Sequence, residues 1–272
     1  MTAPEREVRR ARSGVAYRIE GSGPSLLLLH GLMASGEMFD PLVERLRDGF
    51  RLVVPDLRGH GLSGDLPGPY DVTTCVADLE ELLSEADFGC GGVLGYSHGG
   101  AAAQLLARRH PERVSRLILG GAYACNVSSA RERLEAAAIV GVLTFATPRS
   151  LAGFVVRAGA RDLDPATADW LIGIMGANGR RQMREAAREL ARFDSRPWLG
   201  AIRAPTFVIA GAKDAAVPAR HFERLVYGIP GAVGTVIQGA GHAMIWTHAE
   251  PFADLVRRAA GPLGWESGPA LG

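Results

Sequence analysis

The sequence contains one G-x-S-x-G motif, Gly95–Gly99, with Ser97 at its centre. A short apolar run leads into the motif, and an alanine-rich stretch, Ala101–Ala107, follows it. This order predicts a tight turn from a strand into a helix, which exposes the serine hydroxyl at the carboxyl edge of a sheet. A hydroxyl there can attack a carbonyl carbon, and the N-terminus of the helix favours the negative charge that develops. The alternative interpretation is a glycine-rich turn in which the serine is incidental.

A serine hydroxyl needs a base and an orienting acid, and candidates for both occur downstream. Asp214 and His242 each follow a short apolar run and lie among glycines. The order Ser97, Asp214, His242 is the order expected for a serine nucleophile on a parallel sheet. The segment 120–130 contains no Asp or Glu, so Asp214 has no rival there. The alternatives are a loop histidine without a catalytic role and an aspartate that caps a turn.

A third element is the segment His30-Gly31-Leu32, which ends another apolar run. A glycine lets the backbone approach a substrate closely. The backbone N–H groups of Leu32 and His98 are therefore candidates for an oxyanion hole, which stabilises the negative oxygen of an acyl-transfer intermediate. The imidazoles of His30 and His98 are predicted to be structural, with His30 fixing the loop and His98 contributing only its backbone.

The elements around these residues alternate between strands and helices, which is typical of a parallel sheet covered on both faces. Two segments that meet at Ser13-Gly14 predict an antiparallel entry hairpin. The predicted strands are Leu26–Leu29, Leu52–Val54, Val93–Leu94, Val114–Leu119, Thr206–Ala210 and Gly234–Ile237. The predicted helices between and after them are Glu37–Arg47, Cys75–Ala86, His98–Arg109, Ala219–Tyr227 and His248–Ala259.

The pattern changes after residue 120, where four helical segments follow one another, separated by Gly, Pro and Asn-Gly breaks. These helices predict an inserted, all-helical cap over the sheet. The expected organisation is a core in two parts, 1–123 and 198–260, a cap at 124–197, and a flexible tail at 261–272. The four cap helices are predicted at Ala130–Phe145, Pro148–Ala158, Pro165–Met175 and Arg180–Phe193.

Taken together, these motifs resemble the α/β-hydrolase superfamily, in the branch with a serine nucleophile and a helical cap that includes esterases, lipases and haloperoxidases. The resemblance extends over residues 8–260 and implies a mostly parallel, doubly wound sheet flanked by helices. The chain departs from many relatives at Leu32-Met33-Ala34, where they have a second glycine. Ser97 separates it from the dehalogenase and epoxide-hydrolase branches, which use aspartate. The matching segments are 26–31, 55–61, 95–100, 110–114, 214–218 and 241–242.

The composition of the chain bears on its binding partners and its location in the cell. The chain has 272 residues, 47% of them hydrophobic, and a net charge of +1, so it can bury a large core and has no field that favours nucleic acid. The three cysteines lack a C-x-x-C pair, and no signal peptide or membrane-spanning run is found, so a cytoplasmic protein without membrane insertion is expected.

No cofactor and no metal ion are expected. Residues 59–64 match the dinucleotide fingerprint G-x-G-x-x-G, but Pro67 and Pro69 prevent the helix that the fingerprint requires. No metal-binding spacing of histidines or cysteines occurs. The predicted partner is a small ester-like molecule.

The predicted function is hydrolysis of a carboxylic ester, thioester or lactone of a small to medium, mainly apolar substrate through an acyl-serine. The alternatives are a slow or non-catalytic ligand receptor that retains the same three residues, and a perhydrolase or a C–C bond hydrolase that uses them. Apolar residues of the cap and of the loops are candidates for the substrate pocket. These are Met33, Tyr96, Phe145, Phe154, Trp170, Ile174 and Met175.

Overall fold

The computed structural model describes residues 7–261 apart from 126, 128–129 and 160–162. Its centre is an eight-stranded sheet in the order β1-β2-β4-β3-β5-β6-β7-β8. The strands from β3 to β8 are parallel, and β2 pairs antiparallel with both β1 and β4. The strands are β1 Val8–Arg10, β2 Ala16–Glu20, β3 Ser25–Leu29, β4 Arg51–Pro55, β5 Gly91–Tyr96, β6 Val114–Gly120, β7 Thr206–Gly211 and β8 Val233–Ile237.

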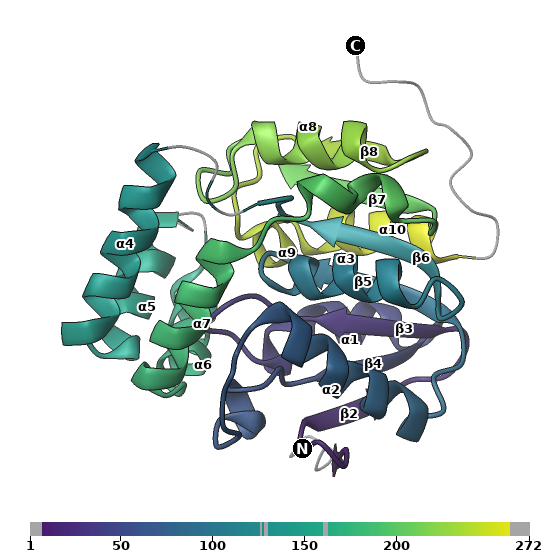
Figure 1. Cartoon of the computed structure of the whole chain (residues 1–272), viewed down its shortest axis with the longest axis horizontal. Helices are drawn as coiled ribbons and strands as arrows, with labels where there is room; N and C mark the ends of the chain where they lie inside the picture. The colour runs from purple at the N-terminus through teal and green to yellow at the C-terminus, as the bar shows by residue number, and fades with distance from the viewer. Residues whose placement is uncertain (1–6, 126, 128–129, 160–162, 262–272) are drawn as a thin grey trace.

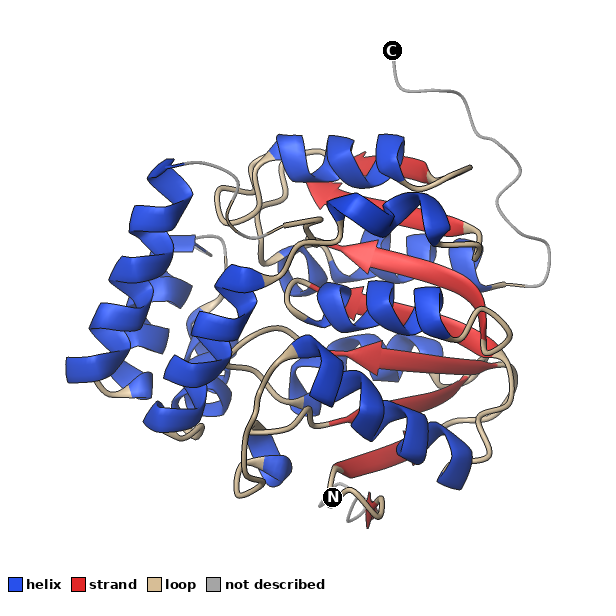
Figure 2. Ribbon diagram, in the orientation of Figure 1, coloured by secondary structure: helices blue, strands red, loops and turns tan. Residues whose placement is uncertain are grey.

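Helices cover both faces of the sheet, as Figure 2 shows. In β3, Leu27 and Leu29 pack with α2, α3 and α8, whereas Leu26 and Leu28 pack with α1, α9 and α10. Successive side chains of a strand point to opposite faces, so a continuous apolar run serves two cores. The helices of the two layers are α1 Asp40–Leu46, α2 Val72–Glu85, α3 Gly99–Arg109, α8 Ala219–Gly228, α9 Met244–Thr247 and α10 Ala249–Ala260.

Four further helices separate β6 from β7 in the chain and lie beyond the carboxyl ends of the strands, at the left of Figure 1. We call this segment, from α4 to α7, the helical insert. Met33 packs against Leu143, Leu151 and Met183 of these helices, so the insert contacts the loop that follows β3. The helices are α4 Ala130–Phe145, α5 Pro148–Gly159, α6 Pro165–Gly176 and α7 Arg180–Arg192.

The fold class expected from the sequence is confirmed, and all predicted strands and helices are present with bounds shifted by only a few residues. The entry hairpin forms as β1 and β2. The predicted helix Glu37–Arg47 is divided into a 3-10 helix, Gly36–Phe39, and α1. Helix α9 and the 3-10 helices Gly61–Ser63 and Arg196–Ala201 were not predicted. Positions 262–272 of the expected tail lie outside the described residues.

The dinucleotide-like segment 59–64 contains only a 3-10 turn, and the next α-helix begins at Val72. In the described part of the chain, no helix has the length and apolar character needed to cross a membrane.

The contact between β5 and α3 tolerates no side chain at its glycines. A methyl group on Gly95 would lie 2.6 Å from the Cα of Gly100 and 2.7 Å from the Cβ of Ala103. A methyl group on Gly99 would collide with the carbonyl oxygen of Leu29. The helix therefore lies directly against the strands, and its N-terminus reaches the edge of the sheet.

We expect Gly95→Ala to lower the free energy of unfolding by about 2 kcal/mol or more, because the buried backbone must move to relieve the overlap. Gly173→Ala is the matched control. Gly173 lies inside α6 with open space around it, so the same substitution should be neutral or stabilise by up to about 1 kcal/mol. Urea unfolding measures both values. Equal effects of the two substitutions would contradict the close packing of β5 and α3.

Candidate active site

Three side chains that are far apart in the sequence form a continuous chain of hydrogen bonds at the carboxyl edge of the sheet. The Oγ of Ser97 lies 3.1 Å from Nε2 of His242. Nδ1 of the same imidazole lies 2.8 Å from Oδ2 of Asp214. A carboxylate accepts hydrogen bonds only, so Nδ1 holds the ring hydrogen and Nε2 presents its lone pair to the serine hydroxyl. This arrangement allows the imidazole to remove the hydroxyl proton.

Strand register explains why the three residues meet. Tyr96 pairs with Gly120 across β5 and β6, and the N–H of Ser97 continues this pairing by donating to the carbonyl of Gly120 at 2.9 Å. Gly211 pairs with Ile237 across β7 and β8. The loops that leave these strands therefore begin at the same level of the sheet, and they deliver Ser97, Asp214 and His242 to one edge.

Backbone strain marks the turn at Ser97. Its φ is +52°, in the left-handed region that non-glycine residues adopt at a cost of about 1–3 kcal/mol. The packing of α3 against β5 holds the turn in this conformation, and Ser97 remains half-buried with its hydroxyl directed to the imidazole.

The carboxylate of Asp214 is held from its other side. Its Oδ1 accepts hydrogen bonds from the N–H groups of Ala216 at 3.0 Å and Val217 at 2.8 Å. The side chain is 2% exposed, whereas that of His242 is 28% exposed. Asp214 thus caps its own turn with one oxygen and bonds to the imidazole with the other, so its capping role does not prevent the contact that the predicted orienting role needs.

The backbone groups expected to form an oxyanion hole lie on two sides of Ser97. A methyl group on Gly31 would lie 3.4 Å from the Cβ of Ser97, so the loop after β3 passes close to the serine. The N–H of Ala34 donates to the carbonyl of Gly31 at 3.2 Å and closes a turn in which Leu32 and Met33 are central. Within the described part of the chain, the N–H groups of Leu32 and His98 have no acceptor, so both can donate to a bound oxygen.

Comparison with known proteins identifies the family of this chain. The family model described as the alpha/beta hydrolase fold matches residues 24–249 of the chain. The chain belongs to this family. It is 32% identical over 239 residues to the pimeloyl-[acyl-carrier protein] methyl ester esterase of Neisseria meningitidis. The aligned region covers 85% of this chain and 91% of that esterase.

Solved structures of hydrolases are also similar to this α/β hydrolase. An esterase from Exiguobacterium antarcticum, EaEST, superimposes with a TM-score of 0.83 at 26% identity, covering 93% of this chain and 98% of that one. A hydrolase from Pseudomonas aeruginosa superimposes with a TM-score of 0.85 at 26% identity, covering 96% of this chain and 100% of that one. The relatives of this hydrolase therefore include enzymes that cleave esters.

Tyr96 helps to position His242 from within the core. It was expected to line the substrate pocket, but it is 2% exposed, and its hydroxyl donates to the backbone carbonyl of His242 in this α/β hydrolase. Its ring centroid lies 5.8 Å from that of the imidazole. Burial, followed by the charge of Asp214, raises the pKa of Tyr96 well above its usual value, so the hydroxyl keeps its proton and remains a donor. The pocket assignment is wrong because Tyr96 belongs to the core beneath the sheet edge.

Two other pocket predictions are also wrong. Phe145 is 87% exposed and Phe154 is 72% exposed, and Phe154 lines a hollow on the outer surface of the helical insert together with Arg149 and Arg157. Apolar residues at helical spacing are typical of a helix with a buried face, but the apolar type of one residue does not show that its side chain lies on that face.

The remaining pocket candidates are at least half-buried. Met33 and Met175 belong to the apolar cluster between the helical insert and the loop after β3. Trp170 lies at the edge of a second cluster that includes Trp246, and Ile174 is buried. Their contact with a substrate stays a prediction.

Three buried histidines stabilise the loops beside Ser97. Nδ1 of His30 donates to the carbonyl of Gly31 at 2.8 Å, and its Nε2 accepts from the N–H of Leu57 at 2.9 Å. The ring of His60 lies 5.1 Å from that of His30 and 6.4 Å from that of His98. Burial lowers the pKa of His30 to about 4 and the pKa values of His60 and His98 to about 3. All three rings are thus neutral near pH 7, which agrees with the structural role predicted for His30 and His98.

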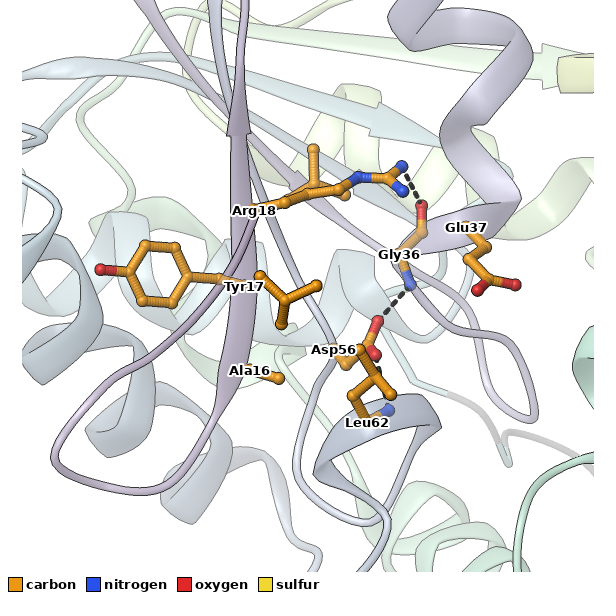
Figure 3. A pocket seen from close by; sticks show the side chains of 9 residues that line it. Ala16, Tyr17, Arg18, Gly36, Glu37, Asp56 and Leu62 are labelled. Atoms are coloured by element: carbon orange, nitrogen blue, oxygen red, sulfur yellow. Dashed lines mark hydrogen bonds between the residues drawn. The ribbon is translucent and has the colours of Figure 1, made fainter. Parts of the chain in front are cut away.

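A separate cavity of about 120 Å³ lies beside β2, away from Ser97. Figure 3 shows Arg18, Gly36 and Asp56 around it, and the carboxylate of Asp56 bonds to two backbone N–H groups. These are the N–H of Gly36 at 2.6 Å and the N–H of Leu62 at 2.7 Å. Asp56 therefore joins the loop after β3 to the loop after β4. Among the described residues, no group of three or more His, Cys, Asp or Glu side chains is placed to hold a metal ion.

Sequence reasoning missed the supporting roles of Tyr96, Asp56 and Asn178. Asn178 was interpreted only as part of an Asn-Gly helix break, yet its side chain is buried and contacts two core loops. A buried amide contributes no pattern to a single sequence, because its partners are backbone groups that every residue possesses. Asp56 lies in the segment that matches the family, and this was the only signal for it.

We expect thermal stability to fall as the pH decreases from 7 to 5. The unfolded chain protonates its histidines near pH 6.5, whereas His30, His60 and His98 resist protonation down to about pH 3–4 in the folded chain. The unfolded state therefore binds more protons in this window, at a cost of roughly 1 kcal/mol per pH unit for each histidine. Above about pH 6.5 the histidines are mostly neutral in both states, so they no longer lower the free energy of unfolding.

Scanning calorimetry between pH 5 and pH 7.5 measures this effect, and the expected decrease in Tm is roughly 5 °C or more. His60→Gln removes one of the three imidazoles and should reduce the slope of Tm against pH. A Tm that does not change over this range would show that the histidines are not buried in their neutral form.

Proposed function

We propose that this α/β hydrolase cleaves carboxylic esters by two-step acyl transfer, with Ser97 as nucleophile, His242 as general base and acid, and Asp214 as orienting acid. The observation that supports this most strongly is the continuous hydrogen-bond chain from the Ser97 hydroxyl to the Asp214 carboxylate. The free N–H groups on both sides of the serine add the means to stabilise an oxyanion.

In the first step, Oγ of Ser97 attacks the carbonyl carbon of the ester while Nε2 of His242 takes the hydroxyl proton. The carbonyl oxygen becomes negative and accepts hydrogen bonds from the N–H groups of Leu32 and His98. Asp214 stabilises the imidazolium that forms. Collapse of the intermediate breaks the bond to the alcohol oxygen, which receives the proton from Nε2, and leaves an acyl-serine.

In the second step, a water molecule takes the place of the alcohol. Nε2 of His242 removes a proton from this water as its oxygen attacks the acyl carbon, and the same oxyanion contacts form again. The bond to Oγ then breaks and Ser97 regains its proton from the imidazolium. The products are the carboxylic acid and the free enzyme.

For the substrate, we propose a small to medium, mainly apolar ester, thioester or lactone. Tyr123, Leu190 and Val217 form an apolar cluster that contacts Leu32, next to the loop that approaches Ser97. The relative named as a methyl ester esterase and the esterase of known structure support ester cleavage over perhydrolysis or C–C cleavage. We place this activity in the cytoplasm, because all three cysteines are free thiols.

Ser97→Ala tests the proposed nucleophile. We expect turnover of p-nitrophenyl butyrate to fall by about 10³-fold or more, because the base and the acid have no function without the nucleophile. Ser22→Ala is the control, since Ser22 is exposed and distant in the sequence from the site. Equal rates in the wild type and in Ser97→Ala would reject the proposed nucleophile.

Asp214→Asn tests the orienting acid. An asparagine oxygen can still accept from the N–H groups of Ala216 and Val217, so the turn should fold. Its NH₂ group, however, would face Nδ1 and favour the tautomer with the hydrogen on Nε2, which cannot accept the serine proton. We expect kcat to fall by about 10²- to 10⁴-fold with little change in KM. Steady-state kinetics measures this, and a rate within tenfold of wild type would place the acid elsewhere.

A further inference from the structure

Asn178 is a buried amide in an otherwise exposed connection. It lies between α6 and α7, and it is 6% exposed although Ala177 before it and Arg180 after it are exposed. Burial of an amide is unfavourable unless its polar atoms find partners, with a cost of about 1–3 kcal/mol when they do not. The contacts of this side chain therefore indicate why it is directed inward.

The side chain of Asn178 connects the helical insert to two loops of the core. Its Nδ2 donates to the carbonyl of Met33 at 2.6 Å and lies 3.2 Å and 3.3 Å from the carbonyls of Ile174 and Met175. Its Oδ1 accepts from the N–H of Gly61 at 2.9 Å. All partners are backbone groups of fixed polarity, so the orientation of the amide is unambiguous.

The carbonyl that Asn178 binds belongs to a strained residue. Met33 has a φ of +64°, a conformation that costs a bulky side chain about 1–3 kcal/mol unless its surroundings enforce it. Met33 follows Leu32 directly, within the turn that the Ala34 N–H closes on the Gly31 carbonyl. The Leu32 N–H belongs to the first peptide unit of this turn, Gly31–Leu32, and the Met33 carbonyl belongs to the last, Met33–Ala34. Asn178 therefore bonds to the end of the short turn that contains the proposed donor.

A second connection holds the far end of the same loop. The carboxylate of Asp56 bonds to the N–H groups of Gly36 and Leu62, as Figure 3 shows. Asn178 bonds to the carbonyl of Met33 and the N–H of Gly61. Both ends of the loop 33–36 are thus tied to the adjacent residues 61 and 62. One of the two connections comes from the core and the other from the helical insert.

We propose that Asn178 is a positioning residue, through which the helical insert holds the Leu32 N–H in the direction required to stabilise the oxyanion. This inference rests on the proposed function and adds a dependence of the oxyanion hole on the helical insert. Removal of the hydrogen bond to Met33 should therefore loosen the turn that carries the Leu32 N–H.

Asn178→Asp is the most selective test. The carboxylate keeps an acceptor for the N–H of Gly61, but it cannot donate to the carbonyl of Met33. We expect kcat for p-nitrophenyl butyrate to fall tenfold or more, with KM changed less than threefold. Inhibition by a trifluoromethyl ketone, whose adduct with a serine carries an oxyanion, should weaken by a similar factor. Asn178→Ala, which removes both contacts, is the second variant if the aspartate prevents folding.

Gln182→Ala is the matched control. Gln182 also belongs to the helical insert, and its amide donates to the carbonyl of Gly64 at 3.2 Å. Gly64 lies on the loop after β4, which contains neither of the proposed oxyanion donors. We expect its kcat to stay within twofold of wild type and its Tm to fall less than in the Asn178 variants, because only one longer hydrogen bond is lost. Loss of kcat in both variants alike would show that attachment of the insert in general is responsible, and would overturn the inference.

Hydrogen–deuterium exchange of the peptide spanning residues 30–38 gives a readout that does not depend on turnover. Faster exchange in Asn178→Asp than in wild type and Gln182→Ala is expected, and unchanged exchange together with unchanged kcat would reject the role of Asn178. If the wild type and Ser97→Ala hydrolyse esters equally, the proposed function fails. The exchange experiment then still decides whether Asn178 orders the loop.

Discussion

The close approach of α3 to β5 fixes the position of the site, because it brings the N-terminus of a helix to the edge of the sheet and forces Ser97 into a left-handed turn. Gly95 and Gly99 make this approach possible, since a methyl group on either would overlap with neighbouring backbone. The strain at Ser97 is offset by the packing of the whole helix. The hydroxyl is consequently fixed by the core of the protein and not by the flexibility of a loop.

The other groups of the site reach the serine through the register of the parallel sheet. Neighbouring strands end at the same level, so loops that are far apart in the chain leave the sheet at the same edge. Ser97 and His242 meet there although 145 residues separate them in the chain. Two of the three proposed catalytic residues also have a second contact that fixes their position. Asp214 is held by the backbone of its own turn, and the loop of His242 is held by the hydroxyl of Tyr96.

The loop after β3 differs from the other loops, because its order depends on partners from several parts of the chain. His30 ties its beginning to the loop after β4, Asp56 ties its end to the same loop, and Asn178 holds its middle from the helical insert. A neutral imidazole, a buried carboxylate and a buried amide satisfy backbone groups that would otherwise be buried without partners. The helical insert is thereby connected to the proposed oxyanion hole as well as placed over the carboxyl edge of the sheet.

The sequence by itself determined the order of strands and helices and the identity of Ser97, Asp214 and His242 as candidates for one site. Apolar runs, glycine-bounded turns and the order of the motifs depend on local chemistry, which is visible in the chain. Only the tertiary structure decided which apolar residues face inward, so that Tyr96 supports His242 while Phe145 and Phe154 lie at the surface. The structure likewise revealed Asn178, because its hydrogen bonds join backbone groups that only the packing of distant segments brings within reach.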